Sequence, residues 1–104
     1  MKAHRSPTQR QEQHHERALC AAILALRSVE ECRSFFRDLC TPAELQAMAD
    51  RWAVVELLER ALPYREIHRL TGVSVTTIGR VARYLTSGSG GYRAVTERLN
   101  GRPA

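Results

Sequence analysis

Apolar residues recur every three or four positions along most of the chain, which is the spacing of one face of an α-helix. The pattern is clearest between residues 42 and 62, where the apolar positions form a stripe wide enough to be buried on more than one side: Leu45, Met48, Trp52, Val54, Val55, Leu57, Leu58 and Leu62. No segment before Gly72 alternates apolar and polar residues with the period of two that marks a β-strand. The pattern therefore predicts an all-α protein.

Residues that favour the start and end of helices divide this pattern into six segments. Thr41-Pro42-Ala43-Glu44 is the clearest start, because threonine can cap a helix, proline suits its first turn and glutamate completes a capping box. Ser28 and Glu31 have the same spacing, while Pro63 and Gly72 are expected to end helices. The predicted helices span residues 9–27, 29–39, 42–62, 63–70, 75–85 and 92–99. We expect a single domain over residues 9–99, with a disordered tail at 1–8 and a frayed tail at 100–104.

The composition fits one small globular domain. The chain has 104 residues, of which 43% are apolar and 26% charged, and these values exclude a disordered protein and a large enzyme. Its longest apolar run, residues 18–26, is shorter than the stretch of about 20 residues that crosses a bilayer, so no membrane partner is expected. Cys20, Cys32 and Cys40 are an odd number without CxxC spacing, which favours reduced thiols in a cytoplasmic protein.

The positive charge of the chain is confined to its last two-fifths. The formal net charge is +5 at pH 7. Residues 1–61 carry nine basic and nine acidic side chains, whereas residues 62–104 carry seven arginines and only two glutamates. A basic excess on one segment is the electrostatic signature expected for a partner that carries phosphates.

Residues 64–83 have the apolar spacing of a helix-turn-helix, which we predict over about residues 63–85. Four apolar residues occupy the positions that pack two helices at a steep angle: Ile67, Val73, Ile78 and Val81. Gly72 lies at the turn, where a side chain would be strained. The second helix would expose short side chains at its start and arginines further along: Val75, Thr76, Thr77, Arg80 and Arg83. Short side chains allow close approach to the major groove, and arginines reach guanine edges or phosphates.

His68 departs from the usual pattern, because the position four residues before the turn glycine commonly holds a small side chain. The histidine predicts an unusual angle between the two helices. A capped helix pair joined by a glycine turn also occurs in plain helical bundles, so the spacing alone leaves that alternative open. The arginine excess on the same segment favours DNA binding.

The sequence from Leu39 to Leu85 resembles the Trp repressor superfamily. The resemblance is carried by L-x-T-P-x-E-x-x-A at the start of the central helix, by Arg51, by R-E-I at residues 65–67, by Gly72 and by T-I-x-R at residues 77–80. The stretch T-G-V-S-V-T-T-I-G-R-V-A-R-Y-L, with S-G-S-G-G-Y close behind, is similar to the YerC/YecD subgroup of Trp repressor-like proteins. The match covers roughly residues 30–98.

This resemblance implies an intertwined, all-helical homodimer in which the first, second and central helices of two chains share one core. It also implies roles for single residues. Val75, Thr76 and Thr77 match groove-facing positions, and Arg65 matches a phosphate contact. We expect Arg80 and Arg83 to supply much of the affinity for DNA, with a steep dependence on salt.

The resemblance also points to an effector pocket, because the Trp repressor binds tryptophan as its corepressor. The matching positions are Thr41, Arg51, Arg80, Val81 and Tyr84. Val81 replaces a glycine beside which the indole lies, and Tyr84 replaces a serine that holds the amino group of the ligand. Both replacements argue against tryptophan. Another small effector, or none, stays open, and Arg51 and Arg80 are then interpreted as phosphate contacts or as partners of acidic residues in the dimer.

No other group of residues predicts a cofactor, a metal or catalysis. His14 and His15 are adjacent and diverge by about 100° on a helix, so they cannot share a metal ion as an i, i+4 pair would. The sequence has no nucleophile motif, no phosphate-binding loop and no paired catalytic carboxylates. We therefore expect neither a metal site nor an enzyme.

These features predict a cytoplasmic, homodimeric, sequence-specific DNA-binding protein, namely a bacterial transcriptional regulator that represses by occluding a promoter. The symmetry of a dimer predicts a near-palindromic operator in double-stranded DNA, with half-sites about 34–36 Å apart. Two alternatives stay open. The chain could be a helical dimeric protein-interaction module, or the DNA-binding piece of a transposase or replication protein.

Overall fold

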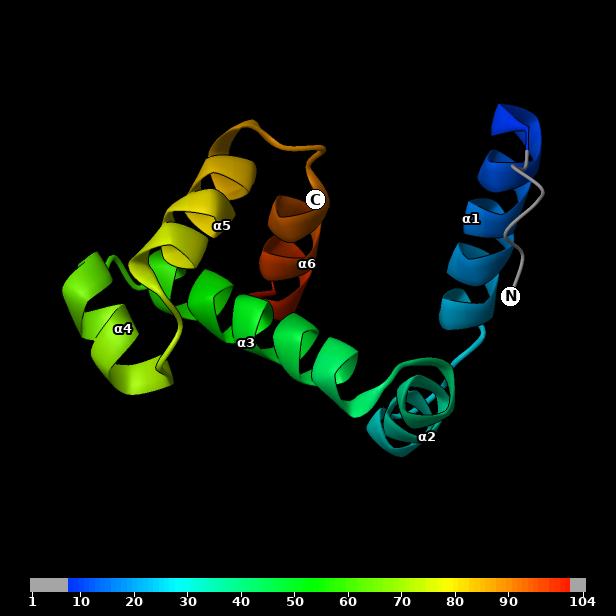
Figure 1. Ribbon diagram of the computed structural model, residues 1–104, viewed down its shortest axis with the longest axis horizontal. Helices are drawn as coiled ribbons and strands as arrows, with labels where there is room; N and C mark the ends of the chain where they lie inside the picture. The colour runs from blue at the N-terminus through cyan, green and yellow to red at the C-terminus, as the bar shows by residue number, and fades with distance from the viewer. Residues whose placement is uncertain (1–7, 102–104) are drawn as a thin grey trace. The chain divides into compact units, whose positions relative to one another are not determined.

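The computed structural model describes residues 8–101, which form six α-helices and no strand (Figure 1). The helices are α1 (Gln9–Leu24), α2 (Val29–Leu39), α3 (Pro42–Glu59), α4 (Tyr64–Thr71), α5 (Val75–Ser87) and α6 (Gly91–Leu99). The predicted all-α fold is confirmed, and each predicted helix is present. Residues 1–7 and 102–104 of the predicted tails lie outside the described residues.

Side-chain caps fix the starts of the first helices. The Thr8 hydroxyl accepts the Gln11 N–H at 3.1 Å, and the Gln11 side chain accepts the Thr8 N–H at 2.9 Å. Thr8 is therefore the cap of α1, and its assignment to a disordered tail was wrong. The Ser28 hydroxyl caps α2 by accepting the Glu31 N–H at 3.1 Å, as predicted. Helix α3 begins at Pro42, also as predicted.

Two helices end three residues earlier than the apolar pattern predicts. The helix predicted over residues 9–27 ends at Leu24, and the Arg27 N–H donates to the Glu31 carboxylate of α2 at 2.9 Å. The helix predicted over residues 42–62 ends at Glu59. Ala61 takes the left-handed conformation there, with φ of 61°, and its N–H turns back to the Leu58 carbonyl at 2.9 Å.

The chain divides after Thr41 into two compact units, residues 1–41 and 42–104. The first unit holds α1 and α2, and neither helix buries a residue. Phe35 and Phe36 contact each other edge to face, with 5.5 Å between ring centroids. Five large apolar side chains of this unit are exposed: Leu19, Ile23, Leu24, Val29 and Leu39. The single domain expected over residues 9–99 stays a prediction.

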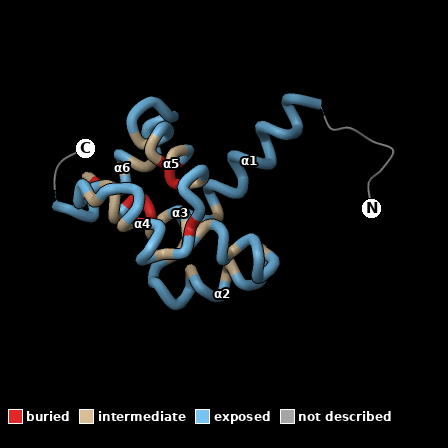
Figure 2. The backbone as a smooth tube through the Cα atoms, turned by 60° about the vertical axis from the view of Figure 1, so that its left-hand side comes forward, coloured by how far each residue is buried: buried red, intermediate tan, exposed pale blue. Residues whose placement is uncertain are grey.

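The second unit is built around the C-terminal half of α3 (Figure 1). Helices α4 and α5 pack on α3 and on each other. Their buried core, coloured red in Figure 2, consists of Val54, Val55, Ile67, Val73, Ile78 and Val81. Helix α6 packs on α5, and its Tyr92 ring lies 6.3 Å from the Trp52 ring of α3, centroid to centroid. Because Val54 and Val55 are consecutive and both fully buried, α3 is covered on more than one side, as its wide apolar stripe predicts.

Three further structural findings bear on the function. No helix between residues 8 and 101 is long and apolar enough to cross a membrane. Over the same range, no three histidine, cysteine, aspartate or glutamate side chains are grouped so that they could hold a metal ion. Cys20, Cys32 and Cys40 are free thiols.

Candidate nucleic-acid interface

Helices α4 and α5 are joined by a three-residue turn, residues 72–74, which is the arrangement expected of a helix-turn-helix. Gly72 ends α4 in the left-handed conformation, with φ of 76°, and its N–H donates to the His68 carbonyl at 2.8 Å. Ser74 then caps α5, because its hydroxyl accepts the Thr77 N–H at 3.1 Å and its carbonyl accepts the Ile78 N–H at 2.9 Å. The predicted motif over residues 63–85 therefore corresponds to two helices over residues 64–87.

The inner face of this unit is closed by apolar packing. The four residues that the sequence assigns to the helix-turn-helix core are all buried: Ile67, Val73, Ile78 and Val81. They pack with Val54 and Val55 of α3, both of which are fully buried. Packing on this face fixes which side of α5 is left to solvent.

The outer face of α5 carries the residues expected to meet DNA. Val75 is 53% exposed, and Thr76, Arg80 and Arg83 are exposed as well. Thr77 is only half-buried, and its hydroxyl oxygen accepts a hydrogen bond from the Ser74 hydroxyl at 3.0 Å. The five residues that the sequence predicts to contact DNA thus all lie on α5, from its first turn onward.

The three arginines predicted to bind DNA, Arg65, Arg80 and Arg83, have no acidic partner between residues 8 and 101. Arg83 lies over the Tyr84 ring, with its guanidinium carbon 5.8 Å from the ring centroid. Arg65 is exposed near the start of α4. Neither these two arginines nor Arg80 forms an ion pair with any residue between 8 and 101. Their charges are therefore free to interact with an anionic partner.

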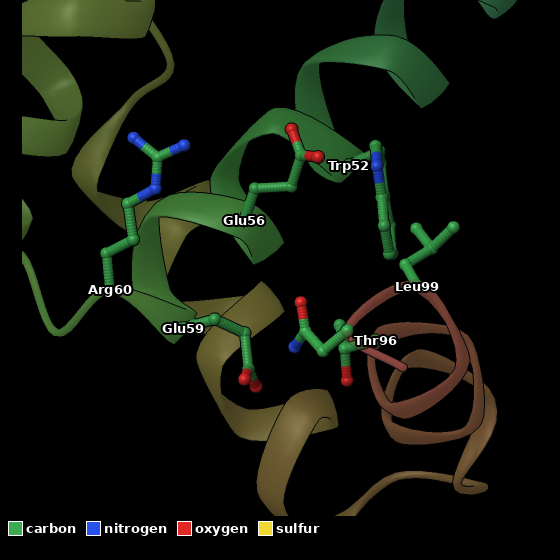
Figure 3. Close-up of a pocket in the computed structure, with 7 residues that line it drawn as sticks. Trp52, Glu56, Glu59, Arg60, Thr96 and Leu99 are labelled. Carbon is green, nitrogen blue, oxygen red and sulfur yellow. The ribbon is translucent and has the colours of Figure 1, made fainter. Parts of the chain in front are cut away.

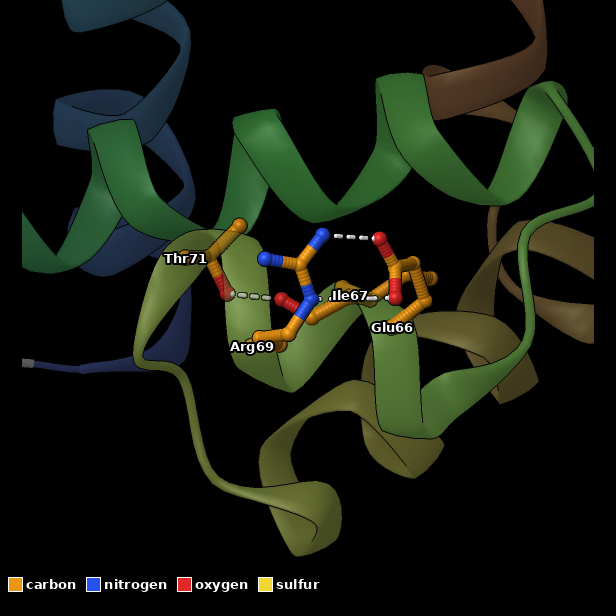
Figure 4. A network of polar contacts seen from close by, with 4 residues as sticks. All are labelled: Glu66, Ile67, Arg69 and Thr71. Carbon is orange, nitrogen blue, oxygen red and sulfur yellow. Dashed lines mark hydrogen bonds and ion pairs between the residues drawn. The ribbon is translucent and has the colours of Figure 1, made fainter.

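Arg69 of α4 is different, because Glu66 holds it in an ion pair that the sequence pattern did not predict (Figure 4). Arg69 Nε donates to one Glu66 carboxylate oxygen at 3.1 Å, and a terminal guanidinium nitrogen donates to the other oxygen. The hydrogen bond from Arg69 lowers the pKa of Glu66 below its ordinary value, and the hydrogen bond to the carboxylate raises the pKa of Arg69. Opposite charges at i, i+3 were the signal that could have revealed this pair.

The turn is further held by side chains of α4. His68 Nδ1 lies 2.7 Å from the Val73 carbonyl oxygen. The Thr71 hydroxyl accepts the Val73 N–H at 3.0 Å and donates to the Ile67 carbonyl at 2.7 Å, the latter bond being drawn in Figure 4. The unusual helix angle expected from His68 stays a prediction, but the structure shows what the imidazole contacts.

The predicted effector residues differ in exposure and location. Val81 is 1% exposed and belongs to the core, so its side chain is not free to line a pocket. Arg51, Arg80 and Tyr84 are exposed in the second unit, whereas Thr41 belongs to the first unit. Tyr84 lines an open groove of about 570 Å³ together with Trp52, Ser89, Gly91, Tyr92 and Val95. Neither Arg51 nor Arg80 lines that groove.

A second hollow, of about 290 Å³, lies between α3 and α6 (Figure 3). It is lined by Trp52, Glu56, Glu59, Arg60, Thr96, Leu99 and Asn100, none of which the sequence had suggested as a site. Thr96 is 6% exposed, and its hydroxyl donates to the Arg93 carbonyl at 3.1 Å. No buried polar side-chain atom between residues 8 and 101 lacks a hydrogen-bond partner.

Comparison with known proteins agrees with the fold. A family model described as Trp repressor protein matches residues 14–100. The chain is 41% identical over 78 residues to uncharacterized protein YerC of Bacillus subtilis (strain 168), a match that covers 75% of each protein. The resemblance to the YerC-like subgroup is thereby confirmed.

Two solved structures are similar over nearly the whole chain. A TrpR-like protein from Eubacterium eligens is 38% identical with a TM-score of 0.76, and the match covers 93% of this chain and 95% of the other. A putative Trp repressor from Staphylococcus aureus is 34% identical with a TM-score of 0.80, covering 90% and 96% of the two chains. The chain therefore belongs to the Trp repressor family of DNA-binding regulators.

Proposed function

We propose that this protein is a sequence-specific regulator of transcription that inserts α5 into the major groove of double-stranded DNA. One observation carries the proposal: α5 buries Ile78 and Val81 against α3 while it exposes Arg80 and Arg83 without any acidic partner between residues 8 and 101. A helix with one buried face and one basic, exposed face suits the second helix of a helix-turn-helix.

The order of side chains along α5 supports this docking. Val75 and Thr76, at its first turn, are short enough to let the helix backbone approach base edges closely. Their methyl groups can contact thymine, and a threonine hydroxyl can exchange hydrogen bonds with a base. Arg80 and Arg83 lie one and two turns further along, where they reach guanine edges or phosphates. Arg65, at the start of α4, is assigned a phosphate contact.

We assign the protein a dimeric state and the role of repressor. The exposed apolar residues of α1 and α2 find no cover within their own unit, which supports a shared core between two chains. Two copies of α5 related by a two-fold axis would read a near-palindromic operator. A small DNA-binding protein represses by occluding a promoter. The free thiols support a reducing, cytoplasmic location.

Tryptophan is not the effector in this proposal. By the resemblance to the Trp repressor, Val81 matches the glycine beside which an indole would lie. In this protein the Val81 side chain is buried in the core. The phenol of Tyr84 stands where a small hydroxyl would hold an amino group. Saturating tryptophan is therefore expected to leave DNA binding unchanged. DNA binding that required tryptophan would contradict this part of the proposal.

Selection of binding sites from a random duplex pool at near-physiological salt tests the proposed function. We expect the wild-type protein to enrich a near-palindrome and Arg80→Ala to lose that enrichment. Arg98→Ala is the matched control, since it removes the same charge from an exposed position on α6. The proposal fails if the wild-type protein enriches nothing, or if both variants behave alike. A wild-type chain that binds no duplex at all would favour the protein-interaction alternative.

A further inference from the structure

Both backbone polar groups of Val73, the middle residue of the turn, are bonded to side chains of α4. Its N–H donates to the Thr71 hydroxyl at 3.0 Å, and its carbonyl lies 2.7 Å from His68 Nδ1. Because a carbonyl oxygen only accepts hydrogen bonds, Nδ1 must carry the proton in this contact. Val73 is 9% exposed, so its polar groups have little access to water.

These two bonds are additional to what ends α4 and starts α5. The Gly72 N–H closes α4 on the His68 carbonyl at 2.8 Å, and Ser74 caps α5 with its own hydroxyl and carbonyl. Both helices are therefore terminated without the His68 and Thr71 side chains. The His68 and Thr71 side chains instead hold Val73, the residue that directly precedes the Ser74 cap of α5, in a fixed position.

The position of that residue matters because α5 is the element that must fit base edges. A shift or rocking of its first turn would move Val75 and Thr76 before it affected the arginines further along. Contacts to base edges need accurate placement, whereas phosphate contacts by long arginine side chains tolerate small displacements. Loosening the turn should therefore cost sequence discrimination more than it costs general affinity for DNA.

We propose that His68 and Thr71 are positioning residues that clamp the turn and thereby set how sharply the protein distinguishes its operator from random DNA. The inference rests on the proposed function, since it assigns a source of specificity to the same helix-turn-helix. It also accounts for a histidine at a position that commonly holds a small side chain: the imidazole spans from α4 to the turn carbonyl.

Two matched pairs of variants separate the hydrogen bonds from the bulk of the side chains. Thr71→Val keeps the shape but removes the hydroxyl, while Thr71→Ser keeps the hydroxyl. His68→Leu removes the donor, while His68→Asn places an amide N–H close to the position of Nδ1. Each pair has one variant that breaks the clamp and one that retains it.

The first measurement is the ratio of affinities for the selected operator and for a random duplex at fixed salt. We expect His68→Leu and Thr71→Val to lower this ratio by about threefold to tenfold, the effect of one net hydrogen bond, with the salt dependence of binding unchanged. His68→Asn and Thr71→Ser should keep the ratio within about twofold of the wild type. The inference is overturned if operator and random binding fall by the same factor, or if the retaining variants lose as much as the breaking ones.

The second measurement is amide hydrogen exchange in the DNA-free protein. The Val73 amide should exchange about threefold to tenfold faster in His68→Leu and Thr71→Val, compared with the Ile78 amide, which bonds to the Ser74 carbonyl and reports general stability. Equal acceleration at both amides would show a loss of stability rather than a loosened turn, and would overturn the clamp. A wild-type chain that binds no duplex would overturn the proposed function and the discrimination role with it, but the exchange rates would still show whether these bonds hold the turn.

Discussion

Thr76 and Thr77 are the same residue type at consecutive positions of α5, yet their hydroxyl groups differ in hydrogen bonding. The Thr77 hydroxyl is hydrogen-bonded to the Ser74 hydroxyl, and its N–H is bonded to the same oxygen, so Thr77 takes part in capping α5. Thr76 is exposed and its hydroxyl has no partner between residues 8 and 101. Of the two threonines, Thr76 is therefore the better placed to read a base edge.

Thr76→Ala and Arg65→Ala should separate base reading from phosphate binding. Thr76→Ala is expected to relax the preference at one operator position and to weaken operator binding by about threefold to tenfold, with random duplex binding unaffected. Arg65→Ala should weaken binding to all duplexes by the same factor and reduce the slope of affinity against salt by about one. Titrations of both variants against operator and random duplex at several salt concentrations check this. If both variants lowered the two affinities in the same ratio, the assigned roles would be wrong.

The exposed face of α5 could be predicted because helical spacing fixes which positions lie opposite Ile78 and Val81. The partners of individual polar groups could not. The bond between the Ser74 and Thr77 hydroxyls depends on side-chain rotamers, which the sequence restricts only weakly. For Glu66 and Arg69, the i, i+3 spacing indicates that a pair can form, but the rotamers decide whether it does. The resemblance assigned Val81 to an effector pocket, whereas the apolar spacing of the helix-turn-helix assigned it to the core, and the packing of α5 on α3 agrees with the apolar spacing.

Among the helices, starts were predicted more accurately than ends. A start is marked by side chains that act on their own neighbours, as Ser28 does for α2. The end of α3 has no such marker, because its left-handed residue is Ala61 instead of the usual glycine. The N–H groups of Ala61 and Leu62 nevertheless bond to the carbonyls of Leu58 and Leu57, at 2.9 and 3.3 Å. An alanine thus completes a helix-ending motif that normally relies on glycine.

Replacing Ala61 by glycine should therefore stabilise the protein. An alanine Cβ is strained in the left-handed region, and removing it should raise the free energy of unfolding by about 0.5–1 kcal/mol, even after the added freedom of the unfolded chain is counted. Ala47→Gly, at an exposed position inside α3, is the control and should lower the free energy of unfolding by about 0.5–1 kcal/mol. Denaturant unfolding at one fixed protein concentration measures both. A destabilising Ala61→Gly would show that the left-handed turn is not strained.

At the scale of the whole molecule, the two units differ in how completely they bury their own apolar surface. The second unit encloses a core of six side chains contributed by α3, α4, α5 and the turn. In the first unit, Leu24 is 85% exposed and Val29 is 72% exposed. Helices without a buried face are not stable alone in water, because most helical stability in proteins comes from packing. In the proposed dimer, the partner chain covers the exposed apolar residues of α1 and α2.

Leu39 and Leu70 provide a direct comparison for this dimer, because both leucines are 51% exposed within one chain. Leu39 ends α2 in the unit that lacks a core, whereas Leu70 lies on α4 beside the proposed DNA-binding surface. Leu39→Gln should weaken dimerisation by about tenfold or more, since burying a leucine contributes about 1.5–3 kcal/mol, while Leu70→Gln should leave it unchanged. Sedimentation equilibrium is expected to give twice the chain mass of 11.8 kDa for the wild type and Leu70→Gln, and a concentration-dependent mass for Leu39→Gln.

Because a monomer can occupy only one half-site, Leu39→Gln should also lose affinity for the full operator more than for an isolated half-site. A wild-type mass of 11.8 kDa at all concentrations would remove the dimer, and with it the reason to expect a palindromic operator.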